Sequence, residues 1–174
     1  MSWRERQGLQ LFKGLALALP LVLGGCFQPL YGPLAGGGSL ESELQAIAVN
    51  PIPERIGHYL ENELAFALNG TGSTVVPKYR LTVALRERVQ TPVIDTVSAR
   101  ATAATVIVDA DYILTPVAGG EAITKGTAFS IASYDRTSQR ISNLQAARDA
   151  ETRNAKFIAD QIRTRISAAL ASRG

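Results

Sequence analysis

The residues whose types could support catalysis are few and poorly arranged for it. His58, the only histidine, falls in a predicted helix near Glu54 and Glu61. It could act as a base or a metal ligand, but a metal site needs several ligands, so an ordinary helix-face histidine is favoured. Asp109 and Asp111 could pair for acid–base chemistry, yet strand residues two apart simply share a side, which favours a solvated face. With no nucleophile elbow, phosphate loop or cysteine-rich cluster, the sequence predicts a protein without enzymatic activity or cofactor.

Arginine is the other residue type with a specific chemistry here, because its guanidinium group binds phosphate in a bidentate manner. Arg80 and Arg86 fall on a predicted strand, and Arg136 falls in the link to the last predicted helix. A sheet face rich in arginine and threonine could contact an anionic lipid head group. An ordinary charged surface is the alternative, and the sequence leaves both interpretations open.

The single cysteine, Cys26, ends a segment with the features of an export signal. A basic start is followed by an apolar run over residues 14–22, which is too short to span a bilayer comfortably. The run leads into Leu23, Gly24, Gly25 and Cys26, an order that resembles the bacterial lipobox. Leu23 suits an apolar protease pocket, the two glycines allow close backbone approach, and the thiol is the nucleophile that takes up a lipid.

This motif divides the chain into three predicted parts. Residues 1–25 form a lipoprotein signal peptide, residues 26–40 form a lipidated, glycine-rich tether, and residues 41–174 form the folded domain. A diacylglycerol on the Cys26 thiol and an acyl chain on the new amino terminus would anchor the domain without a transmembrane helix. An uncut N-terminal anchor with an incidental cysteine is the alternative.

Composition excludes some classes of function. The chain has 174 residues and a formal net charge of +3. Much of this charge lies in the signal segment, so the remaining domain is close to neutral and lacks the concentrated basic face that general nucleic-acid binding needs. Because there is one cysteine, no disulfide can form within the chain, and we expect a single domain stabilised by its hydrophobic core.

Hydrophobic periodicity predicts the order of the elements. Asn50 and Pro51 end a short strand, Pro53 begins a helix, and Asn69 and Gly70 end it. The predicted elements are a strand at 44–49, a helix from about 53 to 68, strands at 79–86, 99–114 and 122–134, and a helix at 140–173, with a loose hairpin connection at 90–97. This order predicts an α+β fold, a two-layer sandwich with a four-stranded mixed sheet and two helices on one face.

Alternation within the strands assigns side chains to faces. Asp109 and Asp111 lie on the polar side of the second long strand, opposite an apolar side. Phe129 and Ile131 share one face of the third strand. Lys125 interrupts that face, so we expect a bulge or an edge position there.

The lipobox and the segment Phe27–Gly32 (FQPLYG) together resemble the start of the LptE family of lipopolysaccharide-assembly lipoproteins, in its alphaproteobacterial form. The resemblance implies a plug inside the LptD β-barrel, delivering lipopolysaccharide to the outer leaflet. Phenylalanine and not aspartate follows the cysteine, which favours a lipid anchor on the periplasmic side of the outer membrane. No family residue is carried over, but Arg80, Arg86 and Arg136 become candidate lipopolysaccharide contacts on their own chemistry.

Two other functions stay open at this point. A lipid-binding or transporter-auxiliary periplasmic lipoprotein, not tied to LptD, would hold a small ligand in a cavity. A lipid-anchored hydrolase would need His58 as its base, and the other usual catalytic groups are missing.

Overall fold

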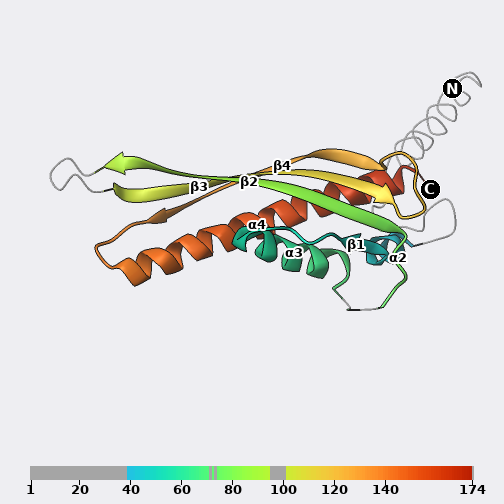
Figure 1. Ribbon diagram of the computed structural model, residues 1–174, viewed down its shortest axis with the longest axis horizontal. Coiled ribbons are helices and arrows are strands. Elements are labelled where there is room, and N and C mark those ends of the chain that lie inside the picture. Colours follow the sequence, from blue (N-terminus) through green and yellow to red (C-terminus); the bar gives the residue numbers. More distant parts are fainter. Residues whose placement is uncertain (1–38, 71, 73, 95–100, 174) are drawn as a thin grey trace, which may run out of the picture. The chain divides into compact units, whose positions relative to one another are not determined.

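Strands and helices follow one another in the order that the periodicity predicts, with one additional helix at the start. The elements are α2 (Leu40–Gln45), β1 (Ile47–Val49), α3 (Arg55–Leu68), β2 (Tyr79–Ile94), β3 (Ala101–Pro116), β4 (Thr124–Asp135) and α4 (Arg140–Ala171). The strands form one sheet in the order β1-β2-β3-β4, in which β1 is parallel to β2 and the other pairs are antiparallel. The helices lie on one side of this sheet (Figure 1), so the predicted α+β sandwich with a mixed four-stranded sheet is confirmed.

The computed structural model describes residues 39–70, 72, 74–94 and 101–173. The predicted lipobox, with Leu23, Gly24, Gly25 and Cys26, lies outside these residues. So do the signal peptide and nearly all of the predicted tether.

Helix α2 replaces the first half of the strand that was predicted at 44–49. The Ser39 hydroxyl accepts a hydrogen bond from the Ser42 N–H (3.1 Å) and caps the helix, so strand pairing begins only at Ile47. The Glu43 carboxylate then ties α2 to the start of β2, because Lys78 and the Tyr79 hydroxyl each donate to it at 2.7 Å. These bonds lower the pKa of Glu43, while burial and Glu43 raise the pKa of Tyr79 to about 12.

Long-range pairing extends β2 beyond its predicted end at Arg86. The strand runs to Ile94 because β3 pairs with it along most of its length. The register shifts between Gln90 and Val93, within the segment where the sequence predicted a loose connection. An irregularity in the ladder therefore takes the place of the predicted loop over these residues.

Strand β4 lies at the edge of the sheet. For Lys125 the sequence predicted either an edge position or a bulge, and the edge position is confirmed. The register of β4 with β3 is continuous from Ala103↔Asp135 to Leu114↔Thr124, so the alternative of a bulge is wrong. Phe129 and Ile131 do share a face, but that face is exposed. The core side of β4 carries the small residues Ala128, Ser130 and Ala132, which let α4 pack closely against the strand.

The core fills the space between the sheet and the helices. Leu60 and Leu64 of α3 and Ile158 and Ile162 of α4 are fully buried there, as the predicted helical stripes require. Each such side chain contributes roughly 1.5–3 kcal/mol on burial. Asn154 is the polar exception, and its amide is satisfied by the Ser130 hydroxyl (2.7 Å) and the Val106 carbonyl (3.0 Å), which joins α4 to both β4 and β3. The remaining large core residues are Leu40, Ile52, Ile56, Leu81, Val106, Tyr112, Leu114 and Ile166.

Candidate functional site on the open face of the sheet

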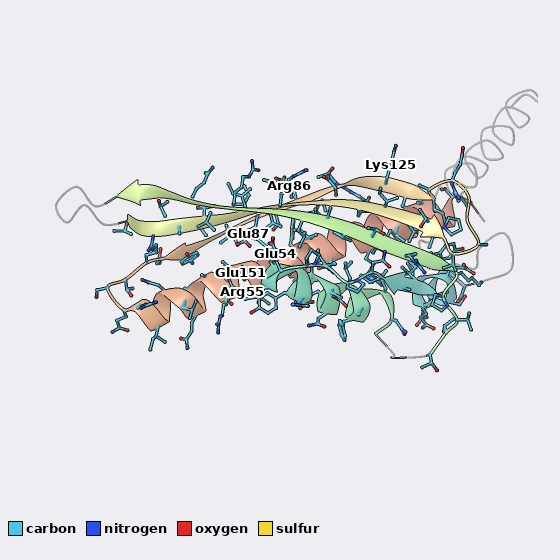
Figure 2. All side chains as sticks on the ribbon, in the orientation of Figure 1. Glu54, Arg55, Arg86, Glu87, Lys125 and Glu151 are labelled. Atoms are coloured by element: carbon cyan, nitrogen blue, oxygen red, sulfur yellow. The ribbon has the colours of Figure 1, made fainter. Side chains whose placement is uncertain are left out.

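The face of the sheet opposite the helices carries a patterned set of charged and apolar side chains. We call it the open face. Figure 2 shows Arg86 and Lys125 pointing away from the helices on this side. Its members are Arg80, Thr82, Arg86 and Arg88 of β2, Thr105, Ile107, Asp109, Asp111 and Ile113 of β3, and Lys125, Thr127, Phe129, Ile131 and Ser133 of β4.

Two diagonal ion pairs cross from β2 to β3 at the middle of the open face. Arg86 contacts Asp111 at 2.8 Å, and Arg88 contacts Asp109 at 2.8 Å. Thr127 of β4 donates to Asp111 at 2.6 Å. This bond, with the charge of Arg86, lowers the pKa of Asp111. The two aspartates therefore lie on the polar face, as predicted, and each is held by an arginine.

Two further cations lie at the end of the open face nearest β1. Arg80 is aligned with Thr115 of β3, and Lys125 is aligned with Ile113 of the same strand. Within the described part of the chain, neither side chain forms an ion pair. Sequence reasoning did not single out Lys125 as a cation of this face, because its placement at the same end of the sheet as Arg80 depends on the register of two strand pairs.

Arg136 lies far from the other two arginines that the sequence singled out. It follows β4, and its N–H donates to the carbonyl of Thr102 at 2.8 Å, near the start of β3. Arg80 is aligned with Thr115, thirteen residues further along β3. At about 3.3 Å per strand residue, the two arginines stand roughly 40 Å apart. The structure therefore places Arg80 and Arg86 on one face and Arg136 at the opposite end of the sheet.

Apolar side chains lie between these charges. Ile113, Phe129 and Ile131 are all exposed on the open face. An amphiphile with an anionic head group could therefore meet both cations and apolar surface here, and so could the wall of another protein.

A second charged cluster lies between the sheet and the helices. Figure 2 shows Glu54, Arg55, Glu87 and Glu151 converging there from α3, β2 and α4. Glu151 is only 3% exposed and receives two hydrogen bonds from Arg55, one from Nε at 2.8 Å. This contact raises the pKa of Arg55. Burial, followed by the charge of Glu151, raises the pKa of Glu87. Glu54 is the residue before α3 and has a backbone φ of 70°.

The described residues offer little for other chemistry. Among them, no group of three or more histidine, cysteine or acidic side chains could hold a metal ion. His58 is exposed on α3. No helix in the described ranges has the length and apolar character needed to cross a bilayer.

The fold and the open face define a small α+β sandwich with one uncovered, amphipathic sheet face. The chain belongs to the LptE family: the family model, described as lipopolysaccharide-assembly, matches residues 44–166. This confirms the resemblance seen in the sequence.

Solved structures share this fold at low sequence identity. A Caulobacter crescentus protein assigned as a lipoprotein is 22% identical, with a TM-score of 0.63 over 76% of this chain and 96% of that one. A minor lipoprotein from Acinetobacter baumannii is 19% identical, with a TM-score of 0.55 over 71% of this chain and 92% of that one. No curated protein matches the sequence.

Proposed function

We propose that this protein is an outer-membrane lipoprotein that acts as plug and assembly partner of an LptD-like β-barrel, in the transport and insertion of lipopolysaccharide. The family match over residues 44–166 carries the proposal. In this proposal the chain is cut after Gly25, and lipids on Cys26 hold the domain on the periplasmic side of the membrane.

The open face has the surface chemistry that a plug requires. The lumen of an outer-membrane barrel is polar, so a body inside it must present polar groups that can exchange partners. In the Arg86–Asp111 and Arg88–Asp109 pairs the arginine side chains are largely exposed, and their carboxylate partners are partly exposed. Surface pairs of this kind typically contribute no more than about 1 kcal/mol, so they can open at little cost. The same face could thus bond to a barrel wall or to a phosphate group.

Direct contact with lipopolysaccharide is the finer part of the proposal. Arg80 and Lys125 have no ion-pair partner among the described residues and could bind phosphate directly, whereas Arg86 would have to leave Asp111 to do so. We therefore expect the end of the face nearest β1 to bind the anionic head group, with Ile113 supplying apolar contact. Arg136, at the other end of the sheet, would contact a different part of the ligand.

Depletion combined with purification tests the main function. Removing the protein from cells should make lipopolysaccharide accumulate in the periplasm or inner membrane, and the tagged wild type should co-purify a barrel protein from detergent extracts. Cys26→Ser should stay unprocessed and unacylated by mass measurement. Normal surface lipopolysaccharide after depletion would contradict the proposal, and bound phospholipid without a barrel would favour a lipid-carrying lipoprotein instead.

Binding of purified lipopolysaccharide to the mature domain tests the finer part. The double variant Arg80→Ala/Lys125→Ala should weaken binding by about tenfold, because two unpaired cations are lost from one end of the face. Arg148→Ala, an exposed arginine on α4, is the matched control and should bind as the wild type does. Equal binding by all three proteins would remove this end of the face from the site.

A further inference from the structure

Strand β4 has the features of an edge that pairs with other strands. It is the last strand of the sheet and keeps a continuous register with β3, so every second residue directs its N–H and C=O away from β3. Residues 128–134 (AFSIASY) contain no charged residue, proline or glycine. Segments of this length and composition tend to pair with copies of themselves when their edge is exposed.

The opposite side of the sheet is protected by other means. Strand β1 has only three residues, and Pro51 and Pro53, which have no N–H to donate, follow it closely. Where β2 continues beyond β1, its register with β3 shifts between Gln90 and Val93. Short edge strands, prolines and irregular registers all hinder pairing with another chain. Strand β4 is twelve residues long and has neither a proline nor a register shift.

Helix α4 instead places a row of hydrogen-bond donors along the edge of β4. The donors are spaced at multiples of four residues, so they share one face of the helix. The carbonyls that accept from them belong to alternate residues of β4, which face away from β3. The contacts are Arg153 to the Ser133 carbonyl (3.0 Å), Gln161 to the Phe129 carbonyl (2.8 Å) and Arg165 to the Thr127 carbonyl.

These donors stand where an added strand would have to lie. Arg153 is also held by Asp149, one turn earlier on α4, because its Nε lies 3.1 Å from that carboxylate. Ile131 lies between two of the bonded positions, and its carbonyl receives no hydrogen bond from the described residues. A single position cannot sustain a strand ladder, which needs several residues in a row. Another strand could therefore pair with β4 only after the donors withdraw.

We propose that Arg153, Gln161 and Arg165 form an edge cap, which blocks strand addition to β4 and prevents two copies of this chain from pairing edge to edge. The cap compensates for the uncharged, proline-free sequence of the strand. This inference goes beyond the proposed function and does not depend on it, because pairing between copies can be measured without a barrel partner.

Removing the three donors tests the edge cap. In the full chain, purified in detergent, Arg153→Ala/Gln161→Ala/Arg165→Ala should form dimers through β4. The average protein mass should rise about twofold over the wild type, because the freed edge of one copy pairs with that of another. Sedimentation equilibrium in a detergent matched to the density of the solvent measures this mass, and thermal melting checks that the variant folds.

A control triple variant removes the same types of side chain from α4 without touching the edge cap. Gln145, Arg148 and Lys156 are exposed, and their side chains form no hydrogen bond or ion pair with the described residues. Replacing all three by alanine removes two cations and one glutamine, as the test variant does, and should leave the mass of one chain. A test variant that melts cooperatively but stays monomeric would overturn the proposal, and so would equal dimerisation of the control.

A proline in β4 shows whether the association uses this edge. The Ile131 N–H faces away from β3, so Ile131→Pro removes an edge donor without breaking the ladder to β3. Added to the cap-free variant, Ile131→Pro should restore the mass of one chain. Ile131→Thr, which removes the apolar side chain but keeps the N–H, should leave the dimers in place. Dimers that persist with Ile131→Pro would assign the association to another surface and overturn the edge cap.

A single substitution keeps the test decisive if the cap-free variant does not melt cooperatively. Gln161→Ala frees the Phe129 carbonyl, next to the uncovered Ile131 position, and leaves Arg153 and Arg165 in place. It should dimerise at higher protein concentration than the triple variant would need. If Gln161→Ala folds and stays monomeric at every concentration reached, the edge cap is wrong.

Discussion

The two sides of the sheet carry the same kinds of charged side chain in opposite surroundings. On the open face, Arg86 and Asp111 meet at 2.8 Å with both side chains in contact with water. On the helix side, Arg55 reaches into the protein to a carboxylate, Glu151, that is almost fully buried. Similar contacts therefore have different consequences, because an exposed pair is screened by water while a buried charge depends on its partner.

This difference separates a surface that can exchange partners from a contact that holds the fold. The Arg55–Glu151 contact joins α3 to α4, and Glu87 of β2 lies close enough for its pKa to respond to both. Opening it would expose an unpaired carboxylate to the core. The pairs of the open face can open without such a penalty, which suits a face that meets another molecule.

The largest predicted effect comes from removing the partner of the buried carboxylate. Arg55→Ala should lower the free energy of unfolding by about 2–3 kcal/mol, because Glu151 would stay buried without a counter-charge. The value lies below that for a fully buried pair because the Arg55 side chain itself is about half exposed. Urea unfolding of the mature domain measures it.

Arg86→Ala is the matched control from the open face. It should change the free energy of unfolding by no more than about 0.5 kcal/mol, as expected for an exposed ion pair. If both variants lost the same stability, the contrast between the two sides would be wrong.

The second prediction uses the raised pKa of Glu87. The folded state holds a proton on Glu87 more tightly than the unfolded state, whose carboxyl has the ordinary value near 4.5. Its contribution to stability is therefore complete below that value and is lost as the pH rises through the folded pKa. Glu87→Gln should thus stabilise the protein at a pH of about 7, and the gain should shrink toward a pH of about 4. Unfolding curves of the wild type and the variant at the two pH values measure this gain in stability. A variant that is less stable than the wild type at neutral pH would contradict the prediction, because it would show that contacts of the Glu87 carboxylate outweigh the cost of its burial.

Local pattern in the sequence predicted the elements well, since periodicity and stop signals act over a few residues. The helix stop at Asn69, the polar placement of Asp109 and Asp111, and the edge position of Lys125 are all of this kind. The predicted start of the first strand, at residue 44, was wrong because Ser39 caps α2 and the helix takes up the residues before Ile47.

The charged contacts could not be predicted in the same way. Arg55 and Glu151 are 96 positions apart in the sequence, so no spacing rule connects them. The placement of Arg80 and Lys125 at the same end of the sheet, on either side of β3, depends on the register of two strand pairs. For the lipobox at Cys26 the sequence remains the sole basis, because it lies outside the described residues.

The smallest predicted effect is that of Asp111→Asn, which tests whether the ion pairs of the open face are weaker than the buried contact of Arg55 and Glu151. The Thr127 hydrogen bond and the charge of Arg86 lower the pKa of Asp111, so its carboxylate stabilises the fold above the ordinary value of 3.8, and this stability is lost as the pH falls through the folded pKa. Asp111→Asn should therefore reduce stability slightly at neutral pH, and the difference should vanish in acid. This pH dependence is opposite in sign to that of Glu87→Gln, and salt should weaken it because the group is exposed. If added salt left the effect of Asp111→Asn unchanged, the pairs of the open face would be as fixed as the buried contact, and that face could not exchange its partners.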